Sequence, residues 1–347
     1  MSDRPGLPRL VLALIVAVYV VTAALYALLT PPWQAPDEPA HYNYVRHVAE
    51  RGDLPVLEAG DYPAQYLEEI KGRQFPPDMP IDQIRYESWQ PPLYYVLAAP
   101  TYRLALALTV SPLVALRLFS VLWGAMLLVV AYHISQRVLP KQAPVGLGVA
   151  ALLATVPMHV AMTAAVNNDT LAELWVALII WQLLGLLSNP APAARQWVLL
   201  GLSMGLGALT KLSTLATAPL AVAVALYIQL HGRKEQDSRA SVWRSALTMA
   251  VPALVLFAPW VLRNLITYGV SDPLIMARHS AVVVGQLRTQ EWLAHVGLLP
   301  AAREMLVTTF HSFWGQFGWM GVPIDDRLYL LLAAGCGLCV LGIAAAW

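Results

Sequence analysis

The sequence predicts an all-α, polytopic membrane protein. We expect a bundle of about eight transmembrane helices and a long extracytoplasmic first loop that carries interfacial helices. Two observations lead to this prediction. Of the 347 residues, 58% are hydrophobic and only 12% are charged, about half the charged fraction of a typical soluble domain. Several apolar runs also reach the roughly 20 residues that a helix needs to cross a bilayer.

The same composition argues against several other classes of protein. A net charge of +1 offers no electrostatic basis for binding nucleic acid. The sequence contains no phosphate-binding P-loop, no dinucleotide-binding glycine pattern and no serine-hydrolase elbow. The eight histidines form no paired zinc-ligand pattern. Cys336 and Cys339 lie inside an apolar run, where packing is the simplest role for both.

The first apolar run, 10–29, follows two arginines near the N-terminus. It is too long for a signal-peptide core and lacks a small-residue cleavage site, so we expect an uncleaved anchor helix. Residues 30–110 then form the long extracytoplasmic loop. Within it, residues 41–51 are expected to form a short helix lying along the membrane interface.

Further apolar runs follow this loop, at about 92–109, 113–136, 144–162, 170–187, 197–210, 214–230, 245–262 and 328–347. The segment 231–244 is the most basic connection between them, so the positive-inside rule assigns it to the cytoplasm. If every run crossed the membrane, counting back would place the basic N-terminus outside, against the same rule. We therefore expect 92–109, which carries Pro100 and Arg103, to lie in the outer leaflet without crossing.

This topology places the N-terminus in the cytoplasm and brings the polar candidate residues to one face. The residues expected at the outer face are Asp37, Glu38, Gln90, Asn167, Asn168, Asp169 and Lys211. The chain is interpreted as a single transmembrane domain, with a bundle at 113–262, a second extracytoplasmic segment at 263–327 and a last span at 328–347. That span stops at Trp347 without a polar tail, so a truncated chain is one interpretation of this end.

The stretch from Pro31 to Tyr42 places two acids and a histidine just beyond the first apolar run. Its prolines are expected to hold the backbone extended rather than helical. Asp37 and Glu38 could act as a general base or bind a divalent cation through oxygen ligands. The alternative is that they are solvated acids or caps of the following helix. His41 lies four residues after Asp37 and would be near it if a helix begins there.

Four later residues can also be interpreted either as structural residues or as members of a functional site. Asn168 and Asp169 precede an apolar run and are typical of a helix start. Their expected place on the same face as Asp37 makes Asp169 a candidate site residue as well. Lys211, between two apolar runs, is either an interface lysine or a point charge for a phosphate, and Arg263 offers the same alternatives.

The order of these motifs resembles the GT-C superfamily of integral membrane glycosyltransferases, such as protein O-mannosyltransferases and lipid A aminoarabinose transferases. The matching stretches are Pro36-Asp37-Glu38, Gln90-Pro91-Pro92-Leu93-Tyr94-Tyr95, Arg117, Asn168-Asp169 and Gly207-Ala208-Leu209-Thr210-Lys211. Two later stretches, 259–264 and 312–319, are similar to a subgroup of bacterial membrane proteins that share the Asp-Glu-Pro-Ala-His opening.

The resemblance implies transfer of a sugar from a polyprenyl-phosphate-linked donor to a hydroxyl or amine of a lipid, glycan or protein acceptor. The reaction would take place at the outer face of a bacterial plasma (inner) membrane. By the family's pattern Asp37 is the general base, with Glu38 and Asp169 as further catalytic acids. Asp37 and Asp169 would also hold a divalent cation, Mg²⁺ or Mn²⁺, where a member uses one. The implied substrate-binding residues are His41, Gln90, Tyr94, Asn168, Lys211 and Arg263.

The sequence departs from the family's pattern in two respects. Gln90 stands where members often carry histidine or lysine, and the predicted spans are fewer than in typical members. Two other functions therefore stay open. One is a transporter or flippase for lipid-linked sugars, which is disfavoured because the charges gather at one membrane face and not at the midplane. The other is a non-catalytic subunit in cell-envelope assembly.

Overall fold

A computed structural model describes residues 6–189, 192–231, 238–285 and 289–346. Its α-helices are α1 (Leu7–Leu29), α2 (Glu38–Arg51), α3 (Ala64–Gly72), α4 (Leu93–Ala107), α5 (Pro112–Val138), α6 (Ala143–Thr155), α7 (Pro157–Thr163), α8 (Asp169–Leu187), α9 (Ala194–Thr210), α10 (Thr217–His231), α11 (Ser238–Tyr268), α12 (Met276–Val282), α13 (Thr289–Val296), α14 (Leu298–Trp314) and α15 (Asp326–Ala346). Two 3-10 helices, η1 (Tyr86–Trp89) and η2 (Leu212–Ala216), and a two-stranded antiparallel sheet, β1 (Gln316–Phe317) with β2 (Val322–Pro323), complete the described elements.

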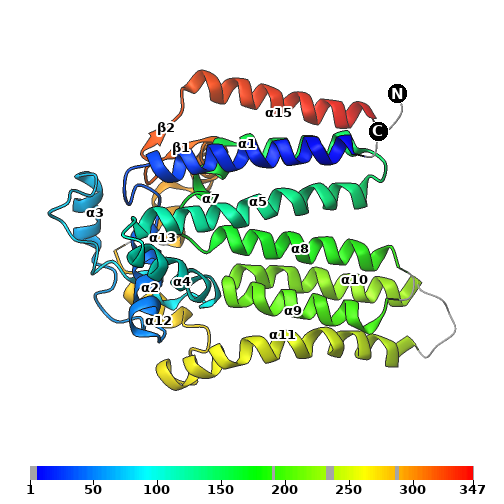
Figure 1. Ribbon diagram of the computed structural model, residues 1–347, viewed down its shortest axis with the longest axis horizontal. Coiled ribbons are helices and arrows are strands. Elements are labelled where there is room, and N and C mark those ends of the chain that lie inside the picture. The colour runs from blue at the N-terminus through cyan, green and yellow to red at the C-terminus, as the bar shows by residue number, and fades with distance from the viewer. Residues whose placement is uncertain (1–5, 190–191, 232–237, 286–288, 347) are drawn as a thin grey trace.

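The long helices run side by side along the longest axis of the molecule, and the short elements gather at one end of them (Figure 1). α5 lies in the centre and packs against α1, α6 and α8, while α9 packs against α8 and α11. The C-terminal end of α10 and the beginning of α11 lie at the opposite end of the bundle. Residues 232–237, part of the basic segment 231–244 that the sequence assigns to the cytoplasm, lie outside the described residues. The short elements and the helix ends that flank 232–237 are thus separated by the length of the bundle.

Five helices among the described residues are long and apolar enough to cross a membrane: α1, α5, α8, α15 and the part of α11 from Trp243 to Tyr268. The α6–α7 pair makes a sixth if it is one span, although it bends by 69° at its break. The single predicted run 144–162 is therefore a broken helix. Val156 is extended and precedes Pro157, as expected because proline disfavours helical geometry in the residue before it. The protein is a helical membrane protein, and the full count of eight spans stays a prediction.

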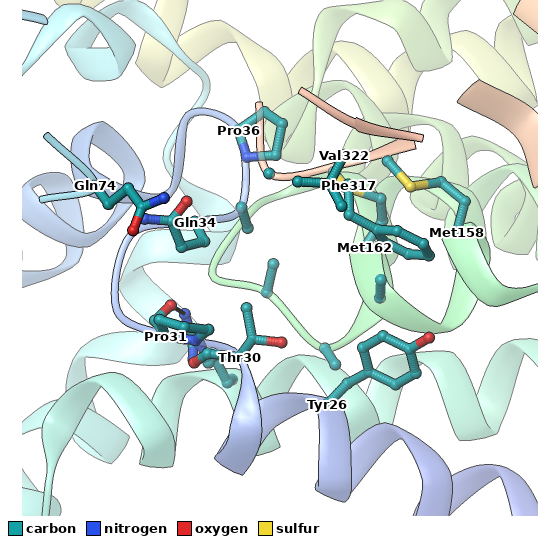
Figure 2. Close-up of a pocket in the computed structure, with 16 residues that line it drawn as sticks. Tyr26, Thr30, Pro31, Gln34, Pro36, Gln74, Met158, Met162, Phe317 and Val322 are labelled. Carbon is teal, nitrogen blue, oxygen red and sulfur yellow. Dashed lines mark hydrogen bonds between the residues drawn. The ribbon is translucent and has the colours of Figure 1, made fainter. Parts of the chain in front are cut away.

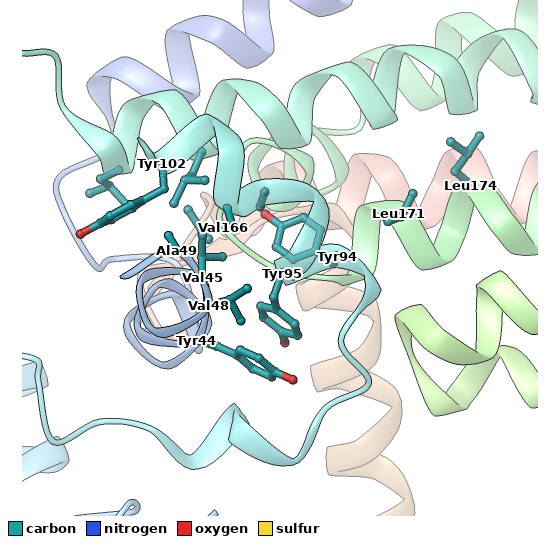
Figure 3. Close-up of a cluster of buried hydrophobic side chains, with 14 of the residues drawn as sticks. Tyr44, Val45, Val48, Ala49, Tyr94, Tyr95, Tyr102, Val166, Leu171 and Leu174 are labelled. Carbon is teal, nitrogen blue, oxygen red and sulfur yellow. The ribbon is translucent and has the colours of Figure 1, made fainter. Parts of the chain in front are cut away.

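α4 lies at the end of the bundle that carries the short elements and is not among the helices that meet the criteria for a span. That 92–109 does not cross the membrane stays a prediction. α4 packs against α2 through aromatic side chains, and the rings of Tyr44 and Tyr95 stack with centroids 3.6 Å apart (Figure 3). Both side chains are almost fully buried. The interfacial loop thus has its own aromatic core, which fixes the position of α2.

Two glycines permit the close approach of α9 and α11. A Cβ atom on Gly201 would lie 2.0 Å from the Met249 carbonyl oxygen, and one on Gly205 would lie 3.0 Å from the Ala253 backbone. Small residues four positions apart let helix backbones meet in a membrane, where packing replaces the hydrophobic effect as the driving force. Since Lys211 directly follows the last residue of α9, this packing also determines where that lysine lies.

The aromatic segment near the C-terminal end folds back onto the opening acidic stretch. Trp319, in the turn between β1 and β2, donates a hydrogen bond from its indole nitrogen to the Trp33 carbonyl at 2.9 Å. The chain passes from α13 to α14 at Gly297, where φ is +81°. Glycine adopts this backbone conformation without a steric penalty, so it separates the two helices.

Candidate active site

Asp37 occupies the junction between the proline-rich stretch and α2. Its backbone is left-handed, with φ of +61°, a conformation that aspartate tolerates better than most residues. The chain is non-helical up to this point, as expected, but it forms turns rather than an extended segment, and Trp33 is also left-handed with φ of +67°. α2 begins at Glu38. The Tyr86 hydroxyl donates to Asp37 Oδ1 at 2.6 Å. The Asp37 side chain makes no capping hydrogen bond to α2, so one of its oxygens is held by Tyr86 and the side chain remains partly exposed.

Glu38, its neighbour, has a different environment. It is fully buried and forms a two-point ion pair with Arg117, with Nε–Oε1 and Nη2–Oε2 distances of 2.7 Å and 2.6 Å. The backbone nitrogens of Trp33 and Val166 also donate to its two oxygens, each at 3.2 Å. A carboxylate held in this way is not open to a substrate. This geometry opposes the catalytic role predicted for Glu38, because both of its oxygens are paired with Arg117.

Arg117 is equally occupied. A guanidinium has five N–H donors, and the three that do not reach Glu38 donate to the carbonyls of Ala27, Thr30 and Pro31 at 3.1, 2.7 and 3.1 Å. The end of α1, the acidic stretch and α5 are therefore joined by one buried side chain.

A chain of buried polar side chains connects η1 to α8. Gln90 Nε2 donates to Glu87 Oε2 at 2.8 Å, and Asn168 Nδ2 donates to Gln90 Oε1 at 3.3 Å and to the Thr210 carbonyl at 2.8 Å. Glu87, Gln90 and Asn168 are 8%, 5% and 0% exposed. Gln90 therefore acts here as a connector between an acid and an amide, which is consistent with a neutral residue at this position.

Asp169 and Lys211 form an ion pair between the first residue of α8 and the residue that ends α9. Their side chains are 42% and 27% exposed, so both are accessible from outside the bundle. The predicted cap of α8 is supplied one position earlier than expected, because Asn167 Oδ1 accepts from the backbone nitrogens of Asp169 and Thr170. The Asp169 carboxylate is thus free of the capping role and faces Lys211.

The charges of these groups act on two buried residues at once. Burial raises the pKa of Glu87 from 4.5 to about 7, and Asp37 and Asp169 raise it while Gln90 and Lys211 lower it. Burial lowers the pKa of His41 from 6.5 to about 4, with Asp37, Lys211 and Asp169 as the charges that modify it. The same three charged groups reach both residues, so loop, α8 and α9 contribute to one site. His41 also shares a 2.8 Å hydrogen bond with the Tyr95 hydroxyl through Nδ1.

The structure thus brings together Asp37, His41, Gln90, Asn168, Asp169 and Lys211. Two predicted binding residues lie elsewhere. Tyr94 is fully buried, with its hydroxyl 2.9 Å from Ser120 Oγ. Arg263 on α11 donates to the carbonyls of Leu54 and Pro55, which fastens the first loop to the bundle. Both positions serve packing in the described structure.

The donor set does not suit a divalent cation. Within the described ranges, no group of three or more histidine, cysteine, aspartate or glutamate side chains is arranged to hold a metal. The predicted ligands also have other partners, since Asp37 accepts from Tyr86 and Asp169 pairs with Lys211. Dependence on Mg²⁺ or Mn²⁺ stays a prediction, which is tested by measuring activity with and without a chelator.

Sequence reasoning missed three residues that shape this site: Tyr86, Glu87 and Trp319. Tyr86 orients Asp37, Glu87 adds a buried acid, and Trp319 holds the backbone of Trp33 ahead of Asp37. The position of Glu87, three residues before Gln90-Pro91, could have indicated a site residue. The loop contains many acidic residues, however, and this spacing does not distinguish a buried acid from one exposed to solvent.

We predict that Glu87→Gln increases the free energy of unfolding relative to wild type, and that this increase is larger at pH 8 than at pH 5. Because the folded-state pKa of Glu87 lies above its ordinary value, the folded protein binds more protons than the unfolded chain between about pH 4.5 and 7. Stability therefore falls as pH rises through that window, by about 3 kcal/mol if the whole difference is expressed. Glutamine is neutral and lacks this loss, while its amide oxygen can still accept from Gln90.

The measurement is the free energy of unfolding in detergent micelles at pH 5 and pH 8 for wild type and Glu87→Gln. His41, whose lowered pKa makes the folded state lose stability as pH falls from about 6.5 to 4, contributes equally to both proteins and cancels. A difference between the two proteins that does not change with pH would show that Glu87 is charged throughout.

An apolar cavity of about 390 Å³ lies beside the acidic stretch. One wall is the segment 30–36 just before Asp37, and the other walls come from α1, α7 and the β1–β2 turn. In Figure 2, Gln34 and Gln74 lie at one end of this cavity and Met158, Met162 and Phe317 at the other. Arg117 also contacts it, but its donors are used internally. The cavity therefore suits a hydrocarbon group.

A family model described as "Predicted membrane protein (DUF2142)" matches residues 78–346. No curated protein matches the sequence. Among solved structures, the fold is similar to that of the S. cerevisiae protein O-mannosyltransferase Pmt1-Pmt2 complex bound to the sugar donor, with a TM-score of 0.51 and 16% identity. The alignment covers 74% of this chain and 33% of that chain, so this chain spans about a third of its neighbour. The likeness confirms a GT-C-like membrane fold.

Proposed function

We propose that this chain, which belongs to the DUF2142 family of predicted membrane proteins, transfers a sugar from a polyprenyl-phosphate-linked donor to an acceptor hydroxyl or amine at the extracytoplasmic membrane face. One observation carries the proposal. A partly exposed aspartate, oriented by a tyrosine, lies in the same polar cluster as a lysine–aspartate pair at the end of the bundle opposite the C-terminal end of α10. The GT-C-like fold supports this assignment as an analogy of fold.

In the proposed reaction Asp37 takes the proton of the acceptor. An acceptor hydroxyl is a weak nucleophile, so its proton must leave as the new bond forms. The acceptor oxygen bonds to C1 of the sugar while the bond from C1 to the phosphate oxygen breaks, and that oxygen keeps the bonding electrons. Tyr86 holds Asp37 Oδ1, which leaves Oδ2 as the oxygen that receives the proton.

The departing polyprenyl phosphate needs a positive charge nearby. Lys211 is the candidate, because its ammonium is accessible and is balanced only by Asp169 in the described ion pairs. As the phosphate approaches, Lys211 can share its donors between the phosphate and Asp169. Asp169 thereby positions the lysine, and Asn168 and Gln90 fix the helix ends on which the pair rests.

The apolar cavity is the proposed binding site for the lipid part of the donor. The apolar cavity adjoins the segment that ends at Asp37, so a prenyl chain bound there would deliver its phosphate toward the polar cluster. The lining is largely apolar, and it includes Tyr26 of α1, a helix long and apolar enough to cross a membrane.

We expect Ala161→Trp, in the cavity wall, to raise the KM for a long-chain donor about tenfold or more. An indole in the cavity removes volume that the prenyl chain would occupy, and the loss of a few buried methylenes accounts for this factor. The turnover of a short-chain, water-soluble donor should stay unchanged. The control is Ala17→Trp, on an exposed part of α1; equal KM values for the two variants would contradict the cavity's role.

The proposal is tested with purified protein in proteoliposomes, supplied with polyprenyl-phosphate sugars and candidate acceptors. Formation of a glycosylated acceptor together with free polyprenyl phosphate is the expected result. Movement of the lipid-linked sugar between leaflets without transfer would instead favour a flippase. Binding of the donor with neither outcome would favour an assembly subunit.

A further inference from the structure

We infer that the protein has a second ligand site, for a phosphate group, at the end of the bundle opposite the candidate active site. A cavity of about 700 Å³ lies between the C-terminal ends of α5 and α8 and the beginning of α9. Its volume is within the range of small-molecule sites in proteins. The cavity is lined by two arginines, Arg137 and Arg195, and by the amides Gln182 and Gln196. None of these residues takes part in the proposed sugar transfer.

The two arginines have no acidic partner to neutralise them. Neither forms an ion pair with any residue that the structure describes. Arg137 donates one hydrogen bond, to the Trp181 carbonyl at 2.7 Å, and its guanidinium lies 4.0 Å from the centre of the Trp181 ring. These contacts fix the guanidinium but leave most of its N–H donors available. A guanidinium group with free N–H donors can bind phosphate through two parallel hydrogen bonds.

The wall of the cavity is shaped around Arg137. A Cβ atom on Gly185 would lie 1.8 Å from Arg137 Nη1, so any larger residue here would require the Arg137 guanidinium to move. Gln182, on the same helix, donates its amide to Ser203 Oγ at 2.8 Å, while its buried Oε1 accepts no hydrogen bond from a described residue. The cavity lining thus presents two cationic guanidinium groups, which matches the negative charge of a phosphate group.

The position of the cavity favours a membrane phospholipid as the source of the phosphate. Arg117 and Arg137 lie 20 positions apart on α5, which separates their Cα atoms by about 30 Å. This equals the thickness of the hydrocarbon core, so Arg137 is at the opposite membrane edge from the candidate active site. By the topology that the basic loop predicts, this is the cytoplasmic leaflet, where anionic headgroups are attracted to clusters of arginine and lysine.

The test uses purified full-length chain titrated with phosphatidylglycerol, phosphatidylcholine or inorganic phosphate, read out by native mass spectrometry and by the melting temperature. We expect phosphatidylglycerol to bind and to raise the melting temperature, with phosphatidylcholine weaker. Arg137→Gln/Arg195→Gln should lower its affinity about tenfold or more, which corresponds to the loss of charge-assisted hydrogen bonds. Arg9→Gln, an exposed arginine on α1 outside the cavity, is the matched control.

A second variant separates geometry from charge. Gly185→Ala keeps both arginines but displaces Arg137, so it should weaken phosphatidylglycerol binding while Arg195→Lys preserves most of it. Binding of inorganic phosphate with the same dependence on Arg137 would assign the site to a soluble phosphate compound. Equal lipid binding by wild type, the double variant and Arg9→Gln would overturn the inference. Both readouts measure binding, so their failure would leave the proposed sugar transfer unaffected.

Discussion

Replacing Asp37 by asparagine is expected to lower the rate of sugar transfer by about 10²- to 10⁴-fold, the usual contribution of a positioned general base. Asparagine keeps the size of the side chain and can still accept the Tyr86 hydrogen bond, but it cannot take a proton from the acceptor. The measurement is kcat and KM for donor and acceptor in proteoliposomes. The loss should fall on kcat, because Asp37 acts as the acceptor bond forms and not in holding the donor.

The control for this experiment is Asp82→Asn. Asp82 belongs to the same loop and pairs with Arg46 at 2.7 Å, but it is 63% exposed, so transfer should be unchanged. Melting temperatures of both variants report whether folding is affected. Transfer by Asp37→Asn at the rate of wild type would exclude Asp37 as the base, and Glu87 would then be the acid to replace next.

The regular part of the fold follows closely from the apolar runs of the sequence. The run 113–136 corresponds to α5 and the run 328–347 to α15, because backbone groups in a bilayer must be satisfied within a helix. Hydropathy is insensitive to where such a helix bends. The bend at Pro157 and the break at Gly297 depend on single-residue backbone preferences, which an average over 20 residues hides.

The sequence predicted several residues of the candidate site, but not the contacts that each of them makes. Asp37, Asp169 and Lys211 were placed on one face by the topology, and the structure brings them into one cluster. The side chains of adjacent residues point in different directions, so the sequence could not say which of Asp37 and Glu38 faces the interior. The partner that decides this, Arg117, is 79 residues away from Glu38 along the chain. Contacts over that distance depend on how helices pack, and no local pattern records them.

The largest expected effect on stability comes from Arg117→Met. The substitution would leave the Glu38 carboxylate fully buried without a cation and would remove the donors to three backbone carbonyls. Breaking one partner of a buried ion pair typically costs about 3–5 kcal/mol. The measurement is unfolding in mixed micelles by denaturing detergent, followed by tryptophan fluorescence. On the same helix as Glu38, Arg46→Met breaks an exposed pair and should cost less than about 1 kcal/mol.

The double variant Arg117→Met/Glu38→Gln distinguishes a structural role of Glu38 from a role in the reaction. With both charges removed, no uncompensated ion stays buried, so stability should recover part of the loss seen in Arg117→Met. Transfer activity should recover in proportion to the folded fraction, because Asp37 is intact. If the double variant folds as well as wild type yet transfers no sugar, Glu38 takes part in the reaction after all. Recovery of both properties would make the Glu38–Arg117 pair the anchor that presents Asp37 at the membrane edge.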